Sequence, residues 1–312
     1  MTIHVLCLNP AVDKLFEIDG FTAGEDYPGQ RPAARVGGKG VNVARVLSQL
    51  GERVHLYAFL GETGGEVFRR EMEPRCACTF ITVPGACRTT VNIIDRINKR
   101  ETVITEAGPV VSQADTELLM RHLGGQVKDG DMVVCSGSII AGAPQDIYAQ
   151  VSRLCMEKGA QCALDCNAKT LPASLEGARY VLGKPNEREL CALLGCARTQ
   201  EPEEIARLAR RLMPPYGALL VSMGAQGGVW VEDEAAYRAC VPEEQIASTV
   251  GSGDASFAGA ICAMARGLRG REALRLAMAC GVANAMLGEV GSIQLGDVND
   301  VMKKVDVESI TE

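Results

Sequence analysis

One segment in the C-terminal part of the chain combines the residues needed to move a phosphoryl group. In Gly251-Ser252-Gly253-Asp254, a glycine loop leads directly into an apolar helical pattern. Backbone N–H groups at such a helix start can hold a transferring anion. The Asp254 carboxylate beside this loop is suited to remove a proton from a hydroxyl group. The same spacing fits an aspartate that only caps the helix, and the local pattern leaves both interpretations open.

A second glycine loop, Val36–Ala44, places Lys39 directly before another helical pattern. Glycines such as Gly38 let the backbone approach a ligand closely or adopt a positive φ, and Lys39 adds a mobile positive charge. The segment lacks the G-x-x-x-x-G-K-[ST] pattern of a Walker A loop. It therefore predicts either an anion-binding loop of another kind or a glycine turn with a surface lysine.

The third segment follows a short apolar run and contains Lys184, Asn186 and Glu189 at the start of a predicted helix. A lysine can contact phosphate, and oxygen ligands suit Mg²⁺, which keeps several of its waters when bound. The alternative is an ordinary helix start, where acidic side chains are favoured by the helix dipole.

Weaker candidates stand near the ends of predicted strands, where ligands bind in open α/β sheets. Asp13 lies just past the first strand, and Ser136–Ser138 and Asp165–Asn167 each end a buried strand. Arg88 begins a segment of strand character. We therefore expect these side chains to face the same edge of the sheet as the glycine loops.

The elements that must position these residues alternate along the chain. Short apolar runs are followed by turn residues and helical patterns, which indicates an α/β fold with a mostly parallel central sheet flanked by helices. Two segments, about 12–36 and 88–106, have strand character without helices and predict a small β-sheet lid. We expect one domain over residues 1–312. The predicted strands are Ile3–Leu8, His55–Leu60, Met132–Cys135, Cys162–Leu164, Tyr180–Leu182 and Ala218–Val221, and the predicted helices are Val41–Leu50, Asp115–Leu123, Pro144–Lys158, Ile205–Met213, Asp254–Arg266 and Arg271–Leu287.

Composition narrows the class of protein. The chain has 312 residues, 47% of them hydrophobic and 23% charged, which is typical of a globular protein with a sizeable core. A net charge of −7 and only 4% aromatic residues disfavour a nucleic-acid partner. The 13 cysteines include no C-x-x-C pair, and no signal peptide or membrane-spanning run is apparent. We therefore expect a protein of the reducing cytoplasm.

Taken together and in this order, the three segments resemble the ribokinase/PfkB family of sugar kinases, and the match covers nearly the whole chain. Gly37–Arg45 is similar to the family's N-terminal signature, Val250–Asp254 to its C-terminal signature, and Lys184–Glu189 to its N-x-x-E element. Two departures are visible. The common Gly-Ala-Gly-Asp-Ser is Gly-Ser-Gly-Asp-Ala here, and the usual Ser-Leu-Pro-x-Gly is Ser-Ile-Ile-Ala-Gly at residues 138–142. Both keep the aspartate and the glycines.

Within the family, the chain most resembles the hexose-phosphate branch, which includes 1-phosphofructokinase and tagatose-6-phosphate kinase. The pointers are Leu8–Asp13, Arg88, Ser136–Ser138 and Gly142–Tyr148. The resemblance implies a ribokinase-like fold, with Mg²⁺ as the cofactor and ATP as the co-substrate. It implies that Asp254, Gly251, Ser252 and Gly253 are catalytic, that Asp13, Gly38, Lys39, Asn42, Arg88, Ser138 and Asp165 bind the sugar phosphate, that Lys184, Asn186, Ser222, Gly224, Gly227 and Asn284 bind the nucleotide, and that Glu189 acts on Mg²⁺ through water.

The implied activity is an ATP-dependent hexose-phosphate kinase. Fructose 1-phosphate, phosphorylated at O6, is the first expectation, and tagatose 6-phosphate or fructose 6-phosphate, phosphorylated at O1, is the alternative. Tyr27–Arg31 stands where the branch often has Val-Asn-Arg, so the substrate stays open.

A catalytically silent sugar-phosphate sensor is a further alternative, although it need not keep Asp254. A nicotinamide-dependent oxidoreductase would need G-x-G-x-x-G after the first strand, which is absent. We expect a phosphorylated hexose and ATP as partners, no nucleic acid or membrane, and a homodimer formed through the β lid.

Overall fold

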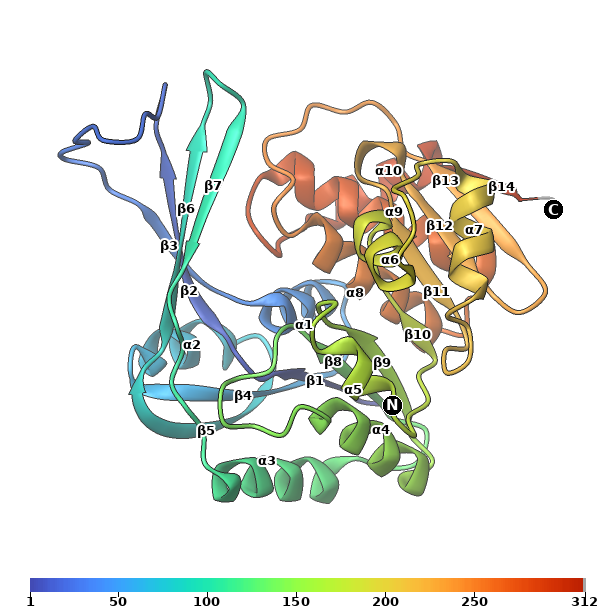
Figure 1. Ribbon diagram of the computed structural model, residues 1–312, viewed down its shortest axis with the longest axis horizontal. Helices are drawn as coiled ribbons and strands as arrows, with labels where there is room; N and C mark the ends of the chain where they lie inside the picture. The colour runs from blue at the N-terminus through green and yellow to red at the C-terminus, as the bar shows by residue number, and fades with distance from the viewer. Residues whose placement is uncertain (311–312) are drawn as a thin grey trace.

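The computed structural model describes residues 1–310, and within them the strands form two sheets (Figure 1). The larger sheet has the order β14-β13-β12-β11-β10-β9-β8-β1-β4-β5, and the smaller one the order β3-β2-β6-β7. The strands of the larger sheet are β1 (Ile3–Cys7), β4 (Val54–Thr63), β5 (Ala77–Ala86), β8 (Met132–Ser136), β9 (Gln161–Asp165), β10 (Leu182–Gly183), β11 (Leu219–Ser222), β12 (Gly228–Val231), β13 (Ala236–Cys240) and β14 (Asp306–Ser309).

The central strands of the larger sheet are parallel and buried on both faces. Val5 of β1 pairs with Leu56 of β4 on one side and Val134 of β8 on the other. Such strands are apolar at consecutive positions because helices cover both faces of the sheet. From β11 onward the sheet becomes antiparallel through β12, β13 and β14. The expected mostly parallel α/β sheet is confirmed.

The helices form a layer on each face of this sheet, and each layer has its own apolar core. Consecutive residues of β1 show the division, because Val5 packs into one core and Leu6 into the other. One layer contains α1 (Lys39–Gln49), α2 (Gly65–Met72), α8 (Ser252–Ala265), α9 (Gly270–Leu287) and α10 (Leu295–Lys304), and the other contains α3 (Gln113–Gln126), α4 (Ile147–Lys158), α5 (Leu171–Leu175), α6 (Glu187–Leu194) and α7 (Pro202–Arg210).

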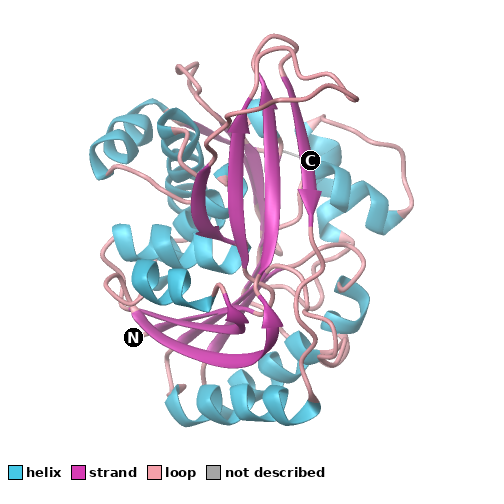
Figure 2. Ribbon diagram, turned by 90° about the vertical axis from the view of Figure 1, so that its left-hand side faces the viewer, coloured by secondary structure: helices cyan, strands magenta, loops and turns pink. Residues whose placement is uncertain are grey.

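The smaller sheet stands apart from the larger one, as Figures 1 and 2 show. Its strands are β2 (Ala11–Glu17), β3 (Ala33–Gly37), β6 (Arg88–Asp95) and β7 (Arg100–Thr105), which lie within the two segments expected to form a lid. β2 starts just after β1, and β3 leads directly into α1. The lid is therefore joined to the main body beside the glycine loop of Val36–Ala44.

The structure differs from the expected elements in several places. α7 spans Pro202–Arg210 where Ile205–Met213 was expected. The run Tyr180–Leu182 contributes only the two-residue strand β10, and Tyr180 makes an isolated bridge with Tyr216. α4 begins at Ile147 rather than at Pro144. The chain also forms α2, α10, β5 and the antiparallel edge β12–β14, which the apolar runs did not predict. Among the described residues, no helix is long and apolar enough to span a bilayer.

Candidate active site

The site lies at the carboxyl edge of the parallel strands, where β1, β8, β9 and β10 end. Asp254, on the first turn of α8, is buried there, with 8% of the residue exposed. The residue before this helix, Gly251, has φ of 82°, a conformation that favours glycine. The turn leaves the first N–H groups of α8 without partners inside the helix. The carboxylate and the first backbone amides of α8 therefore occupy the same helix start.

The two glycine signatures meet at this carboxylate. The Nδ2 of Asn42, on α1, donates a hydrogen bond of 2.8 Å to Oδ2 of Asp254. Burial raises the pKa of Asp254 to about 6, and the Lys39 charge, the Asn42 hydrogen bond and the Lys184 charge oppose that rise. A carboxyl group with a pKa near neutrality is a suitable general base.

A row of alternating charges runs beneath the site. The buried Asp165 carboxylate lies 3.1 Å from the Lys39 ammonium and 3.5 Å from the Lys184 ammonium. The Asp165 charge raises the pKa of Lys39, so that lysine stays charged at neutral pH. A Cβ added at Gly253 would lie 3.6 Å from Nζ of Lys184. The structure therefore brings both lysines to the glycine loop that precedes Asp254.

One cavity, of about 180 Å³, opens beside the lid and is lined by three of the seven residues expected to bind sugar phosphate. Lys39 and Arg88 both line it, although they come from α1 and the lid strand β6. Ser138 lines it too, and its Oγ accepts a hydrogen bond of 3.2 Å from Nδ2 of Asn9. Arg88 is held by the carbonyls of Asn9 and Pro10, at 2.8 and 3.4 Å. Its guanidinium is thus fixed at the wall of the cavity.

Asp13 lies at the root of the lid, on β2. A Cβ added at Gly37 would lie 1.8 Å from its Oδ2, so the absent side chain makes room for this carboxylate. Burial raises the pKa of Asp13 to about 6, against the opposing effects of a Thr90 hydrogen bond and the Arg88 charge. Gly38, with φ of 101°, forms the turn into α1. Gly37 therefore leaves room for the Asp13 carboxylate, and Gly38 allows the backbone turn that starts α1.

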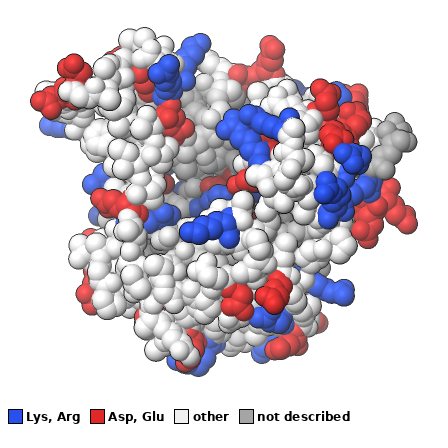
Figure 3. Space-filling view, viewed as in Figure 1, with Lys and Arg blue, Asp and Glu red and all other residues white. Residues whose placement is uncertain are grey.

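A second, larger cavity of about 740 Å³ lies on the other side of the Gly251–Asp254 loop. It is lined by Ser252 and Gly253, and by four residues expected to bind nucleotide, namely Asn186, Ser222, Gly224 and Gly227. Its volume is within the range of cofactor and small-molecule sites. Figure 3 shows the molecule hollowed between the lid and the helices of the C-terminal half, with charged side chains inside the hollow.

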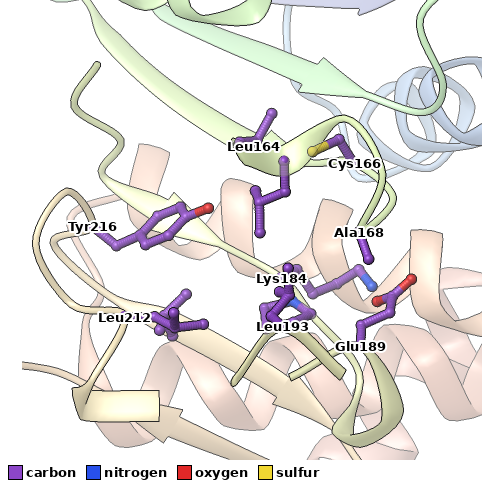
Figure 4. Close-up of a pocket in the computed structure, with 11 residues that line it drawn as sticks. Leu164, Cys166, Ala168, Lys184, Glu189, Leu193, Leu212 and Tyr216 are labelled. Carbon is purple, nitrogen blue, oxygen red and sulfur yellow. The ribbon is translucent and has the colours of Figure 1, made fainter. Parts of the chain in front are cut away.

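Asn186 and Glu189 form a capping box at the start of α6. Oδ1 of Asn186 accepts from the Glu189 N–H at 2.8 Å, and Oε2 of Glu189 accepts from the Asn186 N–H at 2.9 Å. The helix-cap interpretation is therefore observed, while the phosphate and Mg²⁺ roles of Lys184, Asn186 and Glu189 stay predictions. The Glu189 carboxylate faces the Lys184 ammonium (Figure 4). The apolar gap in Figure 4 has a volume of only about 20 Å³, so it holds at most about one water molecule.

The acids of the site fit a magnesium ion that arrives with a nucleotide. Within residues 1–310, no group of three or more acidic, histidine or cysteine side chains is placed to hold a metal on its own. Mg²⁺ commonly takes one or two carboxylates and completes its shell with phosphate oxygens and water. Glu189, with one oxygen outside the capping box, matches that mode.

Three expected ligands lie below the surface of these cavities. Asp165 is buried under the two lysines. Asn42 is 4% exposed and is bonded to Asp254, so its direct contact with sugar hydroxyls stays a prediction. Asn284 is fully buried, and its Nδ2 donates at 2.8 Å to the carbonyls of both Glu289 and Ser292. In this position Asn284 holds the loop that packs against Gly251, rather than lining the larger cavity.

Sequence reasoning missed two sets of site residues. Apolar side chains from β13 onward and from α9 line the larger cavity, and they suit the flat face of a nucleobase. Arg45, whose guanidinium reaches Asn42, was not singled out. The proline after Val241 is a sequence signal for the end of a strand. The strands that pair with this strand could not be found from the sequence. The apolar lining consists of Val241, Ile246, Met278, Val282 and Ala285.

Comparison with known proteins decides among the fold's possible functions. The family model for pfkB family carbohydrate kinases matches residues 7–293, which contain both glycine signatures. The chain belongs to the pfkB family of carbohydrate kinases. The expected ribokinase/PfkB resemblance is therefore confirmed, and the protein is a phosphotransferase that acts on a carbohydrate.

Relatives support the hexose-phosphate branch. The tagatose-6-phosphate kinase of Staphylococcus epidermidis is 30% identical over 308 residues, which is 98% of this chain and 99% of the relative. Phosphofructokinase-2 from Escherichia coli is 22% identical, with a TM-score of 0.88 and coverage of 97% and 99%. A possible 1-phosphofructokinase from Thermotoga maritima is 24% identical, with a TM-score of 0.85 and full coverage of both chains. The two structural likenesses show that the kinase has the same fold as these proteins.

Proposed function

We propose that this kinase transfers the γ-phosphoryl group of ATP to a hydroxyl group of a hexose phosphate. The observation that carries the proposal is the position of Asp254, at a glycine-loop helix start between two cavities. The smaller cavity contains Lys39 and Arg88, which suit a dianionic sugar. The larger one is lined by four of the six expected nucleotide residues. The reacting groups of both substrates would then meet at the Gly251–Asp254 loop.

Each part of the site has a role in this reaction. The Asp254 carboxylate accepts the proton of the attacking hydroxyl, and the free N–H groups of the Gly251–Asp254 turn stabilise charge on the transferring group. Lys184, next to Gly253, adds positive charge at the same place. Mg²⁺ bound to the nucleotide would neutralise phosphate charge, with Glu189 acting on it through water. Catalysis then rests mainly on positioning and electrostatics.

Fructose 1-phosphate, phosphorylated at O6, remains the first candidate substrate. The relative named for tagatose 6-phosphate gives a specific reason to keep that sugar, phosphorylated at O1, as the second. Fructose 6-phosphate is the third, because phosphofructokinase-2 shares the fold. The first and third candidates give the same bisphosphate, and a cavity with cations at one end can take a ketohexose phosphate in either direction.

A coupled assay of ADP release tests the proposal. About a dozen phosphorylated and free sugars would be offered with ATP and Mg²⁺. We expect turnover with at least one of the three ketohexose phosphates and at least tenfold lower kcat/KM with the free sugars. Binding of a sugar phosphate without any ADP release would instead support a silent sensor. The cytoplasmic location and the single-domain organisation over 1–312 stay predictions.

A further inference from the structure

Arg45 is a buried cation behind the site. It lies on α1, only 1% exposed, one turn after Asn42. Its Nη1 donates to Oδ1 of Asn42 and to the Val290 carbonyl, both at 3.2 Å. Its Nη2 donates to Oε1 of Glu71 at 2.7 Å and to the Val36 carbonyl at 2.5 Å. Burying a guanidinium is costly unless it is paired and hydrogen-bonded, and this one is both.

The Arg45 hydrogen bond determines which way the Asn42 amide faces. A side-chain amide has one accepting end and one donating end, whereas a guanidinium can only donate. Because Nη1 of Arg45 approaches Asn42, the amide oxygen must face Arg45. The amide nitrogen is then turned to Asp254, where it donates at 2.8 Å. With the amide reversed, its oxygen would face the carboxylate and would disfavour the charged base.

The same guanidinium joins the base to the lid. Val36 belongs to the lid strand β3, and its N–H donates to Oε2 of Glu71 at 3.3 Å while its carbonyl accepts from Arg45. The loop containing Val290 also packs against Gly251, since a Cβ at Gly251 would lie 2.9 Å from Cγ1 of Val290. Arg45 thus holds three segments together, namely α1, the root of the lid and the loop that packs against Gly251.

We propose that Arg45 is a positioning residue for the kinase reaction, which acts by fixing the Asn42 amide so that it donates to the Asp254 carboxylate. The inference rests on the proposed function. Other charges also face Asp254. Lys39 and Lys184 favour its carboxylate, while Asp165 and Asp13 oppose it. All of these remain when Arg45 is changed, so an effect on Asp254 arises from the Asn42 amide, the guanidinium charge or the lost contacts with the Val36 and Val290 carbonyls.

The test compares two variants that share the loss of the ion pair. Glu71→Gln alone leaves Arg45 bonded to Asn42, whereas Arg45→Met in the Glu71→Gln background removes the oriented donor without leaving a buried unpaired carboxylate. Both are measured by thermal melting, by KM for each substrate, and by the pH dependence of kcat. Arg45→Lys, which keeps a charge beside Glu71 but loses the forked donor, is the second variant if the double variant does not fold.

We expect the double variant to lose about tenfold or more in kcat, within the range for impaired acid–base catalysis. The acid limb of kcat should move to higher pH by about half a unit or more, because the carboxylate loses a hydrogen bond to its charged form. KM for ATP should stay within about twofold. If the limb and kcat match those of Glu71→Gln alone, Arg45 is only structural and the proposal fails.

A measurement without turnover separates this inference from the proposed function. Carboxyl ¹³C shifts of aspartate-labelled protein, with Asp254→Asn used to assign the Asp254 signal, report the pKa of the base directly. If the wild type phosphorylates no hexose phosphate, the proposed function fails, and the ¹³C titration still tests the link from Arg45 to Asp254. An Asp254 pKa that is the same in the double variant and in Glu71→Gln overturns it.

Discussion

The Asn42 amide and the Asp254 carboxylate, 212 positions apart in the chain, form a hydrogen bond of 2.8 Å between the two glycine signatures. The bond spans α1, which leaves the lid, and α8, which follows the anion-binding turn. It ties the half of the chain that lines the smaller cavity to the half that lines the larger one. The proposed base is therefore held by a residue from the half that lines the smaller cavity, while its own backbone belongs to the half that lines the larger one.

Replacing Asp254 with Asn should remove the base and keep the fold. We expect kcat to fall by about 10²–10⁴ or more, the range for loss of a general base, while ATP affinity stays within about threefold. Asp297→Asn is the matched control, because Asp297 is also an acid in the first turn of a helix but lies on α10 rather than beside the Gly251–Gly253 loop. A kcat within tenfold of the wild-type value would exclude Asp254 as the base.

The same variant should be more stable than the wild type at neutral pH. The pKa of Asp254 is about 6 in the fold, against 3.8 for an ordinary aspartate. Between about pH 4 and 6 the native chain therefore keeps a proton that the unfolded chain releases, and stability falls as pH rises through this window. The ionised group costs on the order of 1–3 kcal/mol at pH 7, which Asn avoids. Urea unfolding at pH 7 measures the gain, and a loss of stability would contradict the buried charge.

Activity should rise with pH through the range in which the site carboxyls ionise. Burial raises the pKa of both Asp254 and Asp13 to about 6, and each negative charge opposes ionisation of the other. We expect kcat/KM to increase through about pH 6, with an acid limb that reflects both groups as a coupled pair. Asp13→Asn should move this limb to lower pH and reduce its slope to that of one proton. An unchanged limb would show that Asp13 does not titrate with the base.

Arg88→Ala should weaken binding of the phosphorylated sugar. A lost charge-assisted hydrogen bond costs about 1.5–3 kcal/mol, which is roughly tenfold to a hundredfold in affinity. We expect KM for the sugar phosphate to rise by about that factor and KM for ATP to change little, since Arg88 lines only the smaller cavity. Arg100→Ala, on the exposed lid strand β7, is the control. If Arg88→Ala keeps the full preference for phosphorylated over free sugar, Arg88 does not contact the phosphate.

Local sequence patterns predicted the elements of this fold that are determined by residues close together in the chain. Apolar runs predicted the parallel strands β1, β4, β8, β9 and β11 but not β5, and a glycine stands directly before Lys39 and before Ser252, where α1 and α8 start. The capping box of Asn186 and Glu189 shows why one pattern supports two interpretations, since the same residues cap a helix and face the site. The antiparallel edge β12–β14 depends on pairing between distant segments, which single-sequence periodicity does not contain.

Long-range contacts explain what the sequence left open at the site. The family resemblance implied that Asn42 contacts sugar, and in the structure its amide is hydrogen-bonded to Asp254 and Arg45. Asn284 was expected at the nucleotide, but it is buried and bonded to loop carbonyls. Asp254 lies on another element than Asn42, and the partners of Asn284 are carbonyls of the loop after α9, so the residue type was recognised while its neighbour was not.

The lid should also join two copies of the kinase. Phe16 pairs with Ile93, and Val91 pairs with Ile104, so these apolar side chains share the lid face opposite Asp13. β7 is an exposed edge strand, and Ile104 is 57% exposed, which is the kind of surface that another chain covers. We expect the wild type to be a homodimer and Ile104→Asp to shift it toward the 33.2 kDa monomer in light scattering at micromolar concentration. Val103→Asp, at a 52% exposed position on the other face of the same strand, should leave the dimer intact. A monomeric wild type, or equal dissociation by both variants, would show that this face is not the interface.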